Sequence, residues 1–76
     1  MIKTTQRELR SMVADGIAID ATHMPQDETY ELAREPHTLI ACSYGVYGCN
    51  GVCFKSDETG QMFVVVGRCP NLFILN

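Results

Sequence analysis

The sequence contains no apolar run near the roughly 18 residues that a membrane-spanning helix needs. Its longest runs, residues 62–66 and 72–75, have the length of strands. Residues 1–7 also lack the apolar stretch of about 7 to 15 residues that characterises a secretory signal. We therefore expect a cytoplasmic protein that does not associate with membranes.

Basic residues are few, since six Lys and Arg stand against nine Asp and Glu, for a net charge of −3 at pH 7. This balance argues against direct binding to nucleic acid, whose phosphates attract cations. Six acidic residues lie between positions 15 and 35, where Arg34 is the only base. Two interpretations remain open: a solvated acidic helix face, or a surface that docks on a basic protein groove, including one built for nucleic acid.

The chain is too short for a second domain and shows no internal repeat, so residues 1–76 are expected to form a single domain. Its composition, 46% hydrophobic and 20% charged, is that of a globular protein. A core of this size offsets the entropy of folding by a small margin, so any covalent or metal staple would contribute substantially.

A first helix is predicted at residues 6–14. Thr5 and Glu8 have the spacing of a capping box, and apolar residues then recur at helical intervals. Gly16 suits the left-handed position that follows a last helical turn. Residues 17–19 alternate briefly, which is compatible with a short strand or with an extended connector.

A second helix is predicted at about residues 25–34. Pro25 is favoured in a first turn, and the acidic residues that follow it interact well with the positive end of the helix dipole. Pro36 disfavours a helical conformation at Glu35, so the chain should become extended there.

From residue 38 onward the pattern becomes strand-like. Four strands are predicted, at residues 38–44, 52–55, 62–66 and 72–75. Residues 57–60 form one predicted turn, whereas the preceding hairpin has two alternatives, Tyr47-Gly48 or Asn50-Gly51.

This order of elements predicts an α+β fold in which two N-terminal helices pack on a small antiparallel sheet of three to four strands. Residues 62–66 are apolar on both faces of their strand. Either the helices cover both faces, or one face is left for a partner.

Four cysteines, Cys42, Cys49, Cys53 and Cys69, are many for a small cytoplasmic protein, and they suggest a metal site. Zinc takes four thiolate or imidazole ligands, so His37 is an alternative fourth ligand. A turn at Tyr47-Gly48 would place Cys42 opposite Cys53, as buried residues, a disulfide or a ligand pair.

Nucleophilic catalysis by cysteine requires a histidine and an orienting polar residue, and His23, His37 and Asn50 are formally present. No local signature surrounds any cysteine, and such triads need a larger scaffold. We therefore expect a protein that is not an enzyme and has no catalytic residues.

The residues expected to contact a protein partner fall into two groups. Asp27, Glu28 and Glu31 carry the acidic charge of the second helix. Tyr44 and Tyr47 are rigid aromatic residues beside a turn, a frequent type of interface anchor.

Residues 40–51, with the glycine-rich stretch Tyr44-Gly45-Val46-Tyr47-Gly48, and the terminal residues 72–75 resemble short uncharacterised proteins of bacterial phages and mobile elements. That group includes the anti-CRISPR proteins, which bind and occlude a nuclease complex. The resemblance implies no settled activity and no catalytic residues, and the similarity to anti-CRISPR proteins is one of size and charge. Together with the uneven charge, it leads us to expect a small inhibitor that docks its acidic surface on a basic, nucleic-acid-handling protein. The alternative is a small zinc-stapled structural or regulatory module built on the cysteines.

Overall fold

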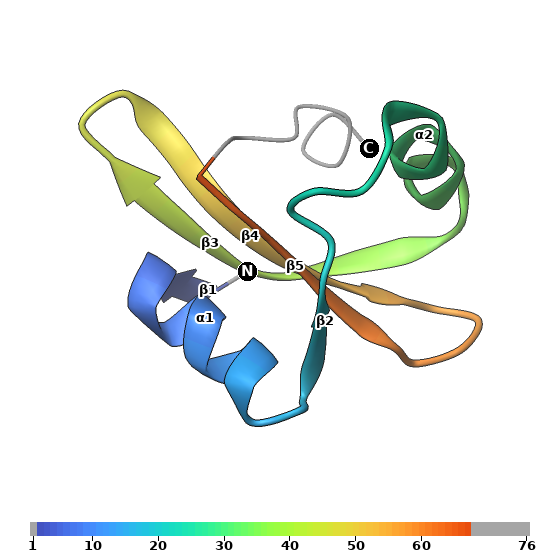
Figure 1. The fold of residues 1–76 in the computed structure, drawn as a ribbon, viewed down its shortest axis with the longest axis horizontal. Helices are drawn as coiled ribbons and strands as arrows, with labels where there is room; N and C mark the ends of the chain where they lie inside the picture. The colour runs from blue at the N-terminus through green and yellow to red at the C-terminus, as the bar shows by residue number, and fades with distance from the viewer. Residues whose placement is uncertain (1, 68–76) are drawn as a thin grey trace.

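The structure is a computed structural model that describes residues 2–67, apart from the side chains of residues 26, 29, 30 and 33. Its elements alternate between strand and helix before ending in three consecutive strands (Figure 1). In chain order they are β1 (Ile2–Thr4), α1 (Gln6–Ala14), β2 (Ala18–Asp20), α2 (Gln26–Arg34), β3 (His37–Gly45), β4 (Gly48–Ser56) and β5 (Met62–Val66).

The five strands form one mixed sheet in the order β1-β3-β4-β5-β2. The central strand β4 is antiparallel to both of its neighbours, β3 and β5, as expected for hairpins. The edge strands are parallel to their neighbours, β1 to β3 and β2 to β5. The predicted antiparallel sheet of three to four strands is therefore wrong.

The two edge strands explain this error. β1 and β2 have three residues each, which is too short to show the alternation by which a strand is recognised in a sequence. Each pairs with a strand that lies far along the chain, so no turn between adjacent strands indicates the pairing. The predicted strand at residues 72–75 lies outside the described residues.

Helix α1 connects the two edges of the sheet and follows its predicted bounds, Gln6–Ala14. Its start is capped by Thr5, whose Oγ1 accepts a hydrogen bond from the backbone N–H of Glu8 at 3.2 Å. At its end Gly16 has a φ of 75°, and the N–H of Ile17 donates to the Met12 carbonyl at 2.9 Å. The chain then enters β2, so the short alternating segment is a strand.

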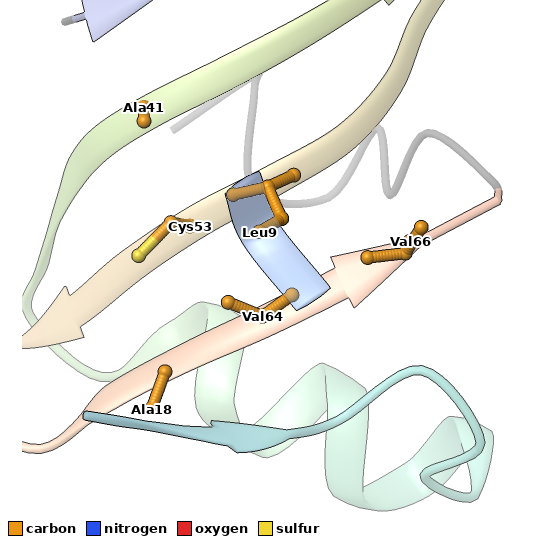
Figure 2. Packing of buried hydrophobic residues seen from close by; sticks show 6 residues of the cluster. All are labelled: Leu9, Ala18, Ala41, Cys53, Val64 and Val66. Atoms are coloured by element: carbon orange, nitrogen blue, oxygen red, sulfur yellow. The ribbon is translucent and has the colours of Figure 1, made fainter. Parts of the chain in front are cut away.

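Apolar residues pack on both faces of the sheet. The face under α1 holds a buried cluster, with Leu9 projecting from the helix over β4 and β5 (Figure 2). Its members are Leu9, Ala18, Ala41, Cys53, Val64 and Val66. On the opposite face Leu32 of α2 and Met24 pack against a second cluster. The buried members of this cluster are Ala21, Val52, Phe54 and Val65.

This arrangement explains why residues 62–66 are apolar throughout. Met62, Val64 and Val66 belong to the cluster under α1, whereas Phe63 and Val65 belong to the cluster on the α2 face. The first of the two alternatives is therefore correct, because a helix covers part of each face of the sheet.

The hairpin between β3 and β4 turns at Val46-Tyr47, between the paired residues Gly45 and Gly48. No residue other than glycine has a positive φ within residues 2–67, and Gly48 takes a φ of 107° directly after the turn. The turn thus lies beside the predicted Tyr47-Gly48 site, whereas Asn50 and Gly51 belong to β4. The β4–β5 connection occupies residues 57–61, one residue longer than the predicted turn at residues 57–60.

Within residues 2–67 no helix has the length and hydrophobicity to cross a bilayer, since α1 and α2 have nine residues each.

Candidate functional site

The tip of the β3–β4 hairpin exposes large side chains to solvent. Val46 is 94% exposed, Tyr47 is fully exposed and Tyr44 is 52% exposed. We name these three residues the aromatic tip. Contiguous apolar and aromatic side chains at an exposed position are typical of a contact surface for another protein.

A β-bulge at Asn50 changes the register of the strands that carry this tip. Ser43 is paired with Gly51, but the next residue, Tyr44, is paired with Cys49, which makes Asn50 an extra residue in β4. Because side chains alternate between the two faces of a strand, one inserted residue moves all that follow to the other face. The bulge therefore separates the faces of Cys49 and Cys53.

The result is a close pair of thiols at the base of the aromatic tip. The Sγ atoms of Cys42 and Cys49 lie 3.0 Å apart, within hydrogen-bonding distance, so that one thiol donates to the sulfur of the other. Cys42 is buried and Cys49 is half-buried. Burial, and then the hydrogen bond to Cys49, raise the pKa of Cys42 to about 11, so this thiol stays protonated at neutral pH.

Cys53 lies apart from this pair. It is paired with Ala41 rather than with Cys42, so the predicted opposition of Cys42 and Cys53 is wrong. The chain turns at Val46-Tyr47, one residue before the Tyr47-Gly48 turn on which that opposition depended. Its side chain is buried in the cluster under α1 (Figure 2), where burial raises the pKa of its thiol.

The alternative predicted ligand His37 does not join the thiol pair. His37 starts β3, opposite Ser56 and at the far end of the strand from the tip, with its ring edge-on to Phe54 at a centroid distance of 5.7 Å. Cys69 lies outside the described residues. Among residues 2–67, no three His, Cys, Asp or Glu side chains converge to hold a metal ion.

The thiol pair provides only part of the ligand set that a structural zinc site needs. A structural zinc site uses four ligands, of which the thiol pair supplies two. The other two ligands would have to come from outside the described residues or from another molecule.

The acidic residues lie on α2, at the opposite end of β3 from the aromatic tip (Figure 1). Asp27, Glu28 and Glu31 are all exposed, and we name them the acidic patch. Asp27 and Glu28 occupy the first turn, where the helix dipole favours negative charge. The structure thus places the predicted partner-binding residues in two separate surfaces.

Charge also differs between the two faces of the sheet. Helix α1 carries two exposed basic residues, Arg7 and Arg10, and one acidic residue, Glu8. Helix α2 carries the acidic patch and one basic residue, Arg34. The helices cover opposite faces, so the protein has an electrostatically acidic α2 side. The sequence indicated the uneven charge, but only the fold shows that it separates by face.

A pocket of about 340 Å³ lies between α1 and the turn after β2. Val64 and Val66 contribute apolar walls, and Arg10, Asp20 and His23 bring charged or titratable side chains. Hydrogen bonds from Thr22, including its N–H at 2.9 Å, lower the pKa of Asp20. Sequence reasoning missed this pocket, because its residues come from three separate parts of the chain.

No protein-family model matches the chain, and comparisons with curated proteins and with solved structures likewise find no match.

Proposed function

We propose that this protein is a non-enzymatic, cytoplasmic binding module that docks on a partner protein with a basic surface. The observation that carries the proposal is the aromatic tip, where Val46 and Tyr47 are almost entirely in solvent. When a partner buries side chains of this kind, the removal of apolar surface from water stabilises the complex.

The acidic patch suggests the charge of the partner. Asp27, Glu28 and Glu31 are exposed together on one helix, and opposite charge speeds association with a basic surface. A groove that binds nucleic acid is basic because it contacts phosphates. The partner in this proposal is therefore a nucleic-acid-handling protein, which the module inhibits by occupying that groove.

The spacing of the two surfaces constrains this complex. The nine residues of β3 separate α2 from the aromatic tip, a span of about 27 Å for an extended strand. A partner that contacts both must present its basic surface and its apolar pocket about this far apart. We include in this proposal an origin from a phage or mobile element and a similarity to anti-CRISPR proteins.

The test begins with capture of a partner from a bacterial extract on the immobilised protein, followed by purification of that partner and measurement of its Kd. Two variants probe the two surfaces: Tyr47→Ala, and the triple change Asp27→Lys, Glu28→Lys, Glu31→Lys. We expect each variant to raise the Kd by at least about tenfold. This corresponds to a loss of roughly 1.4 kcal/mol in binding free energy, as expected when a residue that contributes to the interface is changed.

A matched control reverses two exposed acidic residues elsewhere, Asp15→Lys with Glu58→Lys, and should change the Kd less than twofold. Circular dichroism melting confirms that all variants are folded. The proposal fails if both surface variants bind as well as the wild type. It also fails if the protein itself binds duplex DNA at physiological salt.

The second candidate is a zinc-stapled structural or regulatory module. The observation in its favour is the thiol pair, which has two of the four ligands that zinc requires. Elemental analysis of protein purified without a histidine tag tests it. One zinc per chain, with a Tm that falls on addition of a chelator, would support this candidate, and zinc-free protein would exclude it.

A further inference from the structure

We propose that Cys42 and Cys49 form a redox pair that closes into an intramolecular disulfide across the β3–β4 hairpin. The inference begins from their geometry. A disulfide bond is about 2.05 Å long, so the two Sγ atoms, now 3.0 Å apart, need to approach by about 1 Å. We expect rotation of the two side chains to supply this movement.

The strand pairing holds the two cysteines in place. Cys42 is paired with Val52 on one side of the bulge, and Cys49 is paired with Tyr44 on the other side. This pairing fixes both thiols on the α2 face of the hairpin. Cys53 packs on the other face and does not compete for either thiol.

Exposure sets the order of the chemical steps. Cys49 is half-buried and Cys42 is buried, so an oxidant in solution meets Cys49 first. With oxidised glutathione, the Cys49 thiolate attacks one sulfur, the glutathione S–S bond breaks, and one glutathione thiolate leaves. The product is a mixed disulfide between Cys49 and glutathione.

Cys42 completes the reaction. Its thiol loses a proton to solvent, its sulfur attacks the Cys49 sulfur, and the second glutathione leaves as a thiolate. Overall, two protein thiols become one disulfide, and their two electrons and two protons convert oxidised glutathione into two molecules of reduced glutathione.

The disulfide would enclose the aromatic tip. Residues 42–49 form a covalent loop that contains Tyr44, Val46 and Tyr47, the side chains assigned to the partner contact. Oxidation would then restrict the tip to fewer conformations, while reduction would release it. This regulatory consequence rests on the proposed function, whereas the disulfide itself does not.

The test titrates the reduced full-length chain with glutathione redox buffers and counts the remaining thiols by alkylation and intact mass. We expect the wild type to lose two alkylatable thiols with no glutathione retained. Its Tm should rise by roughly 10 °C on oxidation, as short disulfide loops commonly produce in domains of this size.

Variants identify the pair. Cys49→Ala should abolish both the thiol loss and the rise in Tm, and Cys42→Ala should leave Cys49 as a stable mixed disulfide with glutathione. Cys53→Ala and Cys69→Ala are the matched controls and should close as the wild type does. Because Cys42 is buried, Cys49→Ala alone decides the matter if Cys42→Ala does not fold.

Three results would overturn the proposal: an unchanged thiol count even in fully oxidising buffer, thiol loss that persists in Cys49→Ala, or zinc bound stoichiometrically through Cys42 and Cys49 in the reduced protein. The proposed function is judged separately, from the Kd of the oxidised and reduced forms. A disulfide that forms without altering any partner binding would leave the redox pair intact and remove its regulatory consequence.

Discussion

Leu9 of α1 lies directly over Gly51 of β4, so that a Cβ atom at position 51 would approach Leu9 Cδ1 to 2.8 Å. Leu9 is completely buried and occupies the centre of the cluster under α1. The absence of a side chain at Gly51 therefore allows the helix to pack closely on the sheet.

This contact predicts that Gly51→Ala is destabilising although alanine favours strands more than glycine does. The added methyl group forces Leu9 or the helix to move, which typically costs about 1–3 kcal/mol of the free energy of unfolding. Urea denaturation measures the loss. In a double-mutant cycle, Leu9→Ala with Gly51→Ala should cost clearly less than the two single changes together. Strictly additive effects would show that the two residues do not conflict.

The edge strand β2 is attached to the core through Thr22. The Oγ1 atom of Thr22 accepts a part-buried hydrogen bond from the backbone N–H of Val66 at 3.1 Å, and the N–H of Ala21 donates to the Val64 carbonyl at 2.8 Å. These bonds extend the pairing of β2 and β5 beyond Asp20.

Thr22→Val removes this acceptor and keeps the shape of the side chain. We expect a loss of about 1–3 kcal/mol in the free energy of unfolding, because the Val66 N–H loses its partner. Thr22→Ser retains the hydroxyl and is the matched control, with a smaller loss. Hydrogen exchange at the Val66 amide provides a local measurement: it should be faster in Thr22→Val than in Thr22→Ser, and equal rates would contradict the assignment.

The raised pKa of Cys42 predicts a loss of stability at alkaline pH. In the unfolded chain this thiol ionises near its ordinary pKa of 9.0, whereas in the folded protein the pKa is about 11. Unfolding therefore releases a proton between these values, so the free energy of unfolding of the reduced protein should fall as pH rises from 9 to 11. Below pH 9 the contribution is fully present.

Chemical denaturation of reduced protein at several pH values measures this effect. The free energy of unfolding of Cys42→Ala should decline less steeply with pH than that of the wild type. Cys53→Ala removes a second thiol, whose pKa is also raised by burial. An identical pH dependence in Cys42→Ala and in the wild type would mean that Cys42 does not titrate as described.

Local signals in the sequence were sufficient to predict both helices. Thr5 and Gly16 mark the ends of α1 through hydrogen bonds and a backbone conformation that involve only nearby residues. The presence of the central hairpins was also predictable, because their strands are adjacent in the chain and separated by turn residues. The β3–β4 turn itself was not, since it lies at Val46-Tyr47 and matches neither of the two alternatives. The edge strands β1 and β2 were not, since their pairing depends on contacts with β3 and β5 far along the sequence.

The thiol pair was hidden for a different reason. The sequence suggested a metal site for all four cysteines and, with a turn at Tyr47-Gly48, an opposition of Cys42 and Cys53. The turn at Val46-Tyr47 and the extra residue Asn50 instead place Cys49 beside Cys42 and Cys53 on the other face. A bulge of one residue has no clear signature in this sequence, where two alternative turns were already compatible with the glycines.

The most direct test of this account is the NMR spectrum of the full-length protein with ¹³C-labelled cysteine, since the Cβ resonance of a cysteine moves downfield when it enters a disulfide. The account predicts that oxidised glutathione moves the Cβ resonances of Cys42 and Cys49 together, while those of Cys53 and Cys69 keep their reduced positions. Joint movement of Cys53 or Cys69 with either member of the pair would contradict the register of the β3–β4 hairpin and the redox pair derived from it.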